Sequence, residues 1–216
     1  ATALYHLYSR EPDSDISGTG GNKRNALIVS DPTGDLGSAN LESEVVAGYY
    51  DGSMILTGEK ATAENLKRHS KNVECIHFAC HGVFDVNSAL GTGLMLAATV
   101  NQDCPGESGQ HKRPPSAQRA LFIDTQETGS LGRSGKLLSL VDISQGLNLS
   151  STKLVVLSAC ESGMVMTTGS ADEVIGLPVG FLQAGVPSII SSLWLVDDAS
   201  SQKLIASFYR YYRSDG

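Results

Sequence analysis

Short apolar runs recur along the chain between polar segments rich in turn-forming residues, and each run has the length of a β-strand. Several contain almost no polar residue, which is typical of strands buried on both faces of a sheet. The run KLVVLSAC is the clearest example. The pattern predicts strands over residues 26–30, 53–57, 73–80, 153–160 and 187–194.

Between these strands the apolar residues recur at helical spacing. This spacing predicts helices over residues 39–50, 61–69, 172–184 and from about 198 to 213. Strands that alternate with helices in this way favour an α/β domain with a doubly wound, mostly parallel sheet and helices on both faces. We expect residues 1–216 to form one such domain.

Two segments show neither the apolar runs of strands nor the apolar spacing of helices. Residues 1–24 mix Ser, Gly, Asp and Asn, and they are predicted to form an opening strand or loop followed by a flexible segment. Residues 101–134 are rich in Gly, Pro and Ser around one apolar patch at 120–124. Because a loop of this length in a compact domain is usually functional or disordered, we expect a long flexible loop here.

Composition and charge narrow the class of protein. A length of 216 residues suits one sizeable domain, and 41% hydrophobic with 18% charged residues is ordinary for a globular chain. The net charge of −7 would repel a phosphate backbone, so direct binding of nucleic acid is not expected. No apolar stretch approaches the roughly 20 residues that cross a bilayer, and the first residues resemble no secretory signal, so we expect a cytoplasmic protein away from membranes. A start without Met and an end inside a helical pattern suggest a fragment of a larger protein.

The cysteines are too sparse for a disulfide framework and are expected to be reduced. They are Cys75, Cys80, Cys104 and Cys160. A zinc site built from Cys75, His77, Cys80 and His81 is disfavoured, because alternation along a strand splits them between two faces and no C-x-x-C pair exists. We therefore expect no metal and no cofactor.

Two reactive side chains follow predicted strands. His81 comes after the strand at 73–80, and Cys160 ends the strand at 153–160. Ligand sites of open α/β sheets lie beyond the carboxyl ends of the strands, so these side chains would face each other across one crevice if the strands are neighbours. The alternatives are a buried strand-end cysteine and a histidine that caps a strand. His77 competes as the base, but alternation places it against a helix, where a core histidine is expected.

This pair suits a cysteine peptidase, which needs a thiolate, a histidine to accept and return its proton, and amide donors for the oxyanion. Small residues flank the thiol in SACESG, and Gly82 follows His81, so a peptide backbone could approach from both sides. Spacing alone leaves the catalytic and the structural interpretation of the pair open.

The segments HFACHGVFD (77–85), LVVLSACESG (154–163) and EVIGLPVGFLQAGVPSIISSLWLVDDASS (173–201) closely resemble the CHAT domain family, a caspase-like family often attached to tetratricopeptide repeats. The similarity extends over residues 25–36, 41–62 and 135–150. It implies a caspase-like fold, with Cys160 as nucleophile, His81 as general base, and an oxyanion site formed by the backbone amides of Cys160 and Gly82. Caspases carry Q-A-C-[RQG]-G with the histidine about 50 residues upstream. Here the sequence is S-A-C-E-S-G and the histidine lies 79 residues upstream, so the chain differs from caspases themselves.

The substrate pocket is a further expectation. In caspase-like peptidases it is built from the loops that follow the first strand and the strand after the nucleophile, which here carry Asp31, Trp194, Asp197 and Asp198. Several carboxylates in one pocket would favour a Lys or Arg side chain. The alternatives are a turn at Asp31, a helix cap at Asp197 or Asp198, and a core or interface position for Trp194.

These observations predict a cysteine endopeptidase that cleaves protein substrates after a basic residue, controlled by a partner or a flanking tetratricopeptide-repeat domain. The alternative is a caspase-like signalling or binding module with little or no proteolytic activity. Basic residues in the 101–134 loop would make it a self-cleavage site, although a disordered insertion would be cut by any protease. An esterase or nucleotide binder is disfavoured, because the chain has no G-x-S-x-G and its Gly-rich stretch precedes a strand.

Overall fold

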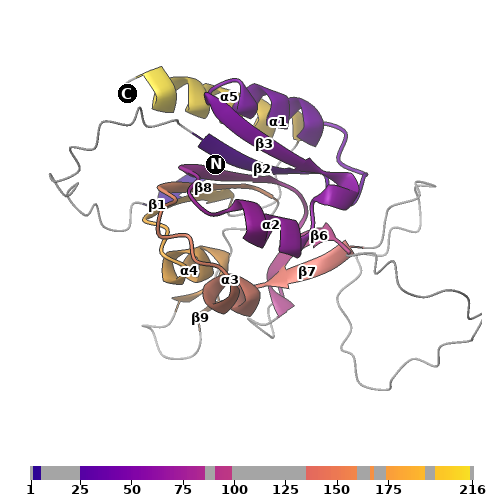
Figure 1. The fold of residues 1–216 in the computed structure, drawn as a ribbon, viewed down its shortest axis with the longest axis vertical. Helices are drawn as coiled ribbons and strands as arrows, with labels where there is room; N and C mark the ends of the chain where they lie inside the picture. The colour runs from indigo at the N-terminus through magenta and orange to yellow at the C-terminus, as the bar shows by residue number, and fades with distance from the viewer. Residues whose placement is uncertain are drawn as a thin grey trace, which may run out of the picture.

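A computed structural model gives the fold (Figure 1). It describes residues 2–5, 25–85, 91–98, 135–159, 166–167, 174–192 and 198–214. Most of the predicted opening segment 1–24 and all of the predicted loop 101–134 lie outside these ranges.

The centre of the fold is a twisted sheet of six strands in the described part of the chain (Figure 1). Each strand is parallel to its neighbours, except that β1 pairs antiparallel with β11. The strands lie in the order β1 (Thr2–Tyr5), β11 (Ser188–Ser192), β8 (Leu154–Ser158), β4 (Cys75–Ala79), β2 (Asn25–Ser30) and β3 (Gly52–Thr57). The predicted fold class, a doubly wound and mostly parallel sheet, is confirmed.

Helices cover both faces of this sheet (Figure 1). On one face lie α1 (Ala39–Ala47) and α5 (Asp198–Ser214). On the other lie α2 (Ala63–His69), α3 (Leu140–Gly146) and α4 (Leu177–Gln183). Each face buries its own apolar cluster among the described residues. The result is a three-layer domain, with the sheet in the middle.

Alternation along β2 shows how one strand serves both clusters. Leu27 and Val29 pack toward the α2, α3 and α4 side, whereas Ala26 and Ile28 pack toward α1 and α5. All four are at most 2% exposed. Because burying each large apolar side chain contributes about 1.5–3 kcal/mol, a strand buried on both faces needs the continuous apolar run seen in the sequence.

A smaller antiparallel sheet was not predicted. Within the described residues it consists of β5 (Gly82–Val83), β6 (Gly93–Ala97) and β7 (Gly135–Ser139). Its strands are short and begin with glycine, so they carry little strand signal. The end of β6 lies beside the start of β7, because Ala97 is opposite Gly135. A second short pair joins β9 (Met166–Thr167) to β10 (Val174–Ile175), and a single 3₁₀ turn, η1, spans Gly58–Lys60.

One helix begins later than predicted, and another was not predicted. The helix predicted over residues 172–184 begins only at Leu177, because Gly176 is extended and Pro178 fits the first turn of a helix but not its interior. The helix α3 was missed, although Ser139 and Asp142 form a capping box at its start.

In α1 the exposed side chains include Leu41 and Val45, while Glu42 and Val46 are buried. A carboxylate therefore takes a place on the buried face. No helix in the described ranges is both long and apolar enough to cross a membrane.

Truncation of a core ring tests this packing. Phe78 is fully buried in β4, and its ring centroid lies 5.6 Å from that of Phe181 in α4. We expect Phe78→Ala to lower the free energy of unfolding by about 3–5 kcal/mol, because it leaves a cavity between sheet and helix. Urea denaturation followed by circular dichroism measures this change. Leu41→Ala, at a side chain that is 58% exposed, should stay within about 0.5 kcal/mol of the wild type, and a loss as large as that of Phe78→Ala would contradict the packing described.

Candidate active site

The strands that precede His81 and Cys160 are direct neighbours. β4 and β8 form a parallel ladder in which Ala79 lies opposite Ser158. His81 follows two residues after Ala79, and Cys160 follows two residues after Ser158. The two strands are thus adjacent, as the prediction of a shared crevice requires. His81 is described, whereas Cys160 lies outside the described residues, so its place relative to His81 stays a prediction.

The loops after β2 and β4 meet at the point where the strand order reverses. The chain passes from β2 to β3 on one side and from β4 to β8 on the other, so these two connections diverge between β2 and β4. A hydrogen bond of 2.9 Å from the backbone N–H of Asp31 to the carbonyl of Ala79 ties the first loop to the end of β4. Ligand sites of open α/β sheets form at such switch points.

His81 contacts a carboxylate from the first loop. Its Nε2 lies 2.9 Å from Oδ1 of Asp35, and both side chains are about two-fifths exposed. The carboxylate can only accept, so Nε2 carries the proton of this bond. The backbone of His81 is also held, because its carbonyl accepts a 2.9 Å hydrogen bond from Met95 in β6. Nδ1 is then the ring nitrogen that stays available to accept a proton.

Asp35 is held in its charged form. Partial burial raises the pKa of Asp35, but hydrogen bonds from Thr33 and His81 and the attraction of His81 outweigh this and lower the pKa below its ordinary value. The hydroxyl of Thr33 donates at 2.5 Å to the same Oδ1. Sequence reasoning missed Asp35, although it lies in a loop at the carboxyl end of a buried strand.

Asp31 organises the same loop. It is 8% exposed and has a left-handed backbone with φ of 41°. Its Oδ1 accepts backbone hydrogen bonds from Gly34, Asp35 and Leu36 at 2.9–3.1 Å. This is the turn role that the sequence offered as the alternative to substrate binding. A contact of Asp31 with substrate stays a prediction.

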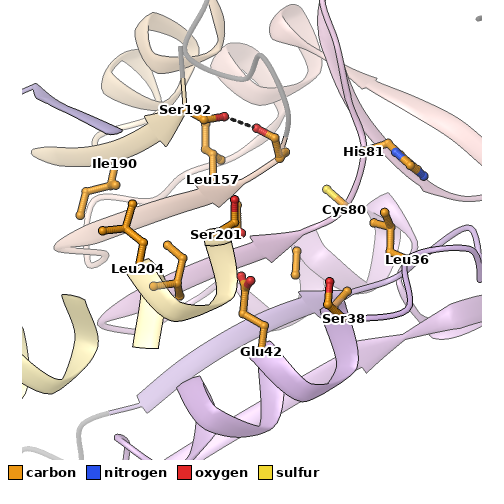
Figure 2. A pocket seen from close by; sticks show the side chains of 15 residues that line it. Leu36, Ser38, Glu42, Cys80, His81, Leu157, Ile190, Ser192, Ser201 and Leu204 are labelled. Carbon is orange, nitrogen blue, oxygen red and sulfur yellow. Dashed lines mark hydrogen bonds between the residues drawn. The ribbon is translucent and has the colours of Figure 1, made fainter. Parts of the chain in front are cut away.

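A pocket opens beside His81 (Figure 2). It has a volume of about 70 Å³ and lies among the carboxyl ends of β4, β8 and β11, the start of α1 and the first half of α5. Its walls are mainly apolar, and Glu42 extends into it from α1 (Figure 2). The other lining residues are Leu36, Ser38, Ala39, Ala79, Cys80, Leu157, Ser158, Ala159, Ile190, Ser192, Ser201, Leu204 and Ile205.

The backbone before Cys160 is anchored at this pocket. The hydroxyl of Ser192 in β11 donates a 2.7 Å hydrogen bond to the carbonyl of Ala159, shown as the dashed line in Figure 2. Gly82, the predicted oxyanion donor, is half-buried at the start of β5. Trp194 and Asp197 lie outside the described residues, and Asp198 begins α5 with only its backbone described. Their predicted substrate contacts stay predictions.

His77 occupies the core, as expected. It is fully buried, with Nε2 2.8 Å from Glu42 Oε1 and Nδ1 3.2 Å from the hydroxyl of Tyr209 in α5. Cys75 lies on the same face, 3.4 Å from that hydroxyl, whereas Cys80 packs into the cluster on the other face. Both thiols are free. No metal-binding group of three or more His, Cys, Asp or Glu side chains is present in the part of the chain that the structure describes.

The comparisons with known proteins agree with this architecture. The model of the CHAT domain matches residues 3–216. The chain belongs to the CHAT domain family. The predicted family is thus confirmed by the match. CHAT domains are caspase-like modules related to peptidases.

Two curated relatives of this chain are named as tetratricopeptide repeat proteins. Tetratricopeptide repeat protein 28 of Mus musculus is 28% identical over 180 residues, and that of Homo sapiens is 29% identical over 185 residues. Each match covers 82% of this CHAT domain but only 7% of the relative. The chain therefore corresponds to a small part of the length of these relatives.

The contact between Asp35 and His81 can be tested by titration. We expect the carboxyl carbon of Asp35, followed by NMR, to titrate below the ordinary aspartate pKa of about 3.9. Because the folded-state pKa is depressed, the stabilisation is present above about pH 4 and is lost as the pH falls through the folded value. Thr33→Val and His81→Ala should each raise the pKa of Asp35, since each removes a hydrogen bond that favours the carboxylate. A midpoint at or above 3.9 in the wild type would contradict the contact.

Proposed function

We propose that this CHAT domain is a cysteine endopeptidase in which Cys160 is the nucleophile and His81 the general base. The observation that carries the proposal is the pairing of β4 with β8, which brings the ends of the two strands leading to these residues together. The anchored carbonyl of Ala159 supports it, because a fixed backbone directly before Cys160 limits where the thiol can lie.

In the proposed reaction, Nδ1 of His81 takes the proton of the Cys160 thiol, and the thiolate attacks the carbonyl carbon of the scissile peptide bond. The C–N bond then breaks, and His81 returns its proton to the leaving amine. Water, deprotonated by His81, then attacks the thioester carbonyl, the C–S bond breaks, and His81 returns the proton to the sulfur of Cys160. The carboxylic acid product releases its own proton to solvent. No cofactor or oxidant is needed for this balance.

Asp35 acts as a positioning residue in this proposal. Its bond to Nε2 fixes the ring and the tautomer, so that Nδ1 is the basic nitrogen, and its charge stabilises the imidazolium that forms. The proposed oxyanion donors are the backbone amides of Cys160 and Gly82. The absence of a side chain at Gly82 supports this, because a substrate carbonyl can approach the backbone there.

The substrates that we propose are proteins cut after a basic residue, with Asp31, Trp194, Asp197 and Asp198 near the pocket. Control by a partner or a flanking repeat domain is supported by the repeat proteins among the relatives. A reducing, cytoplasmic location is supported by the free thiols of Cys75 and Cys80 and by the need for a reduced Cys160.

Substitution of the proposed dyad separates a peptidase from a binding module. The full-length protein and its Cys160→Ala and His81→Ala variants are incubated with peptides that carry Lys, Arg, Asp or Leu before the cleaved bond. We expect each substitution to lower kcat/KM by at least about 10³-fold, because the nucleophile or its base is lost. His69→Ala, at the end of α2, is the matched control and should cleave like the wild type. Equal cleavage by wild type and Cys160→Ala would support the binding module instead.

Asp35→Asn tests the positioning role. The amide keeps the size of the side chain but removes its charge, so His81 loses the partner that fixes its tautomer. We expect kcat/KM to fall by about 10²–10⁴-fold, mostly in kcat, with KM little changed. Steady-state kinetics across pH measures both constants. Asp51→Asn, at an exposed turn before β3, is the control, and an Asp35→Asn variant with wild-type kcat would exclude the role.

A further inference from the structure

Glu42 is a buried carboxylate in a largely apolar pocket. It lies in the first turn of α1, is 5% exposed, and extends into the same pocket that His81 lines (Figure 2). Burial of an ionised group is costly unless a partner compensates its charge. Among the described residues, the side chain of Glu42 makes one hydrogen bond, the 2.8 Å bond between its Oε1 and Nε2 of His77. In the part of the chain that the structure describes, Glu42 pairs with neither Lys nor Arg. A cationic group from a substrate could therefore compensate its charge.

The side chains behind Glu42 form a chain of three hydrogen bonds that can all donate toward its carboxylate. Burial raises the pKa of the Tyr209 hydroxyl well above its ordinary value and that of the Cys75 thiol to about 11, so both keep their protons. Cys75 can then donate to Tyr209, Tyr209 to Nδ1 of His77, and Nε2 of His77 to Glu42. A single ring proton satisfies both nitrogens of His77. The chain of contacts ends at Oε1 of Glu42, and neither Lys nor Arg is part of it.

The pocket walls complement a long aliphatic stem. Leu36, Leu157, Ile190, Leu204 and Ile205 line it, with the hydroxyls of Ser38 and Ser201 among them. A volume of about 70 Å³ holds several water molecules, since one needs about 10–15 Å³ on this measure. Such a space suits a side chain that buries methylene groups and carries its charge at the tip.

We infer that Glu42 is the specificity-determining residue, and that its carboxylate binds the ammonium group of a lysine side chain directly before the scissile bond. The inference rests on the proposed peptidase function and names its substrate class. Lysine is favoured over arginine because Oε1 is already bonded to His77, whereas a guanidinium binds best to two carboxylate oxygens at once. Asp31 is less suited to this role, because its Oδ1 is occupied by three loop amides.

The test compares peptides that differ only in the residue before the cleaved bond: lysine, arginine or norleucine, which has an aliphatic side chain without the ammonium group. With the full-length wild type we expect kcat/KM to be about 10- to 100-fold higher for lysine than for norleucine, with arginine between them. Glu42→Gln should remove the preference while it keeps cleavage of the norleucine peptide, which also shows that the variant is folded. Glu44→Gln, at an exposed position of the same helix, is the matched control and should keep the preference.

Binding to the full-length Cys160→Ala variant, measured by calorimetry, separates specificity from catalysis. Tighter binding of the lysine peptide than of the norleucine peptide, lost when Glu42→Gln is added to Cys160→Ala, would support the role of Glu42 even if the wild type cleaved neither, an outcome that would count against the peptidase proposal alone. A wild type that cleaves and binds norleucine as well as lysine peptides would overturn the inference without any variant at position 42. A lysine preference that persists in Glu42→Gln would overturn it as well.

Discussion

The parallel pairing of β4 with β2 on one side and β8 on the other is the constraint on which the candidate site depends. Parallel strands end at the same edge of a sheet, so three chain segments that are distant in sequence meet there. β2 contributes the loop with Asp35, β4 contributes His81, and β8 leads to Cys160. A slip of one residue in any of these ladders would move the pocket side chains to the opposite face of the sheet.

Beneath the pocket, a set of polar side chains is buried between the sheet and the helices α1 and α5. Here Cys75, His77, Tyr209 and Glu42 form a buried polar chain within a largely apolar cluster. A partly satisfied network would destabilise the core, and this one leaves only the carboxylate end facing a cavity. The core therefore supports the charge at the base of the pocket, and the packing of α5 against the sheet becomes part of the site.

The central sheet was predictable because strands such as β2 and β8 must be apolar on both faces, which leaves a continuous signal in the sequence. β6 and β7 were not, since they are short, begin with glycine and depend on each other for pairing. The position of His81 followed from its strand. Its contact with Asp35 did not, because it depends on how the turn around Asp31 folds. Glu42 was missed for a similar reason: next to Leu41 and Val45 it resembles a solvent-facing residue, and its contact with His77 depends on how α1 packs against β4.

Because β6 and β7 pair with each other, residues that are far apart along the chain lie close together in space. Ala97 and Gly135 are cross-strand partners, so whatever number of residues joins them, both ends are fixed by the same ladder. The entropic cost of closing such a loop grows only slowly with its length. Insertions or deletions between these strands can therefore accumulate without moving His81 relative to β8. The interval of 79 residues between His81 and Cys160 is then a poor criterion for finding related proteins, and the two short segments around these residues are a better one.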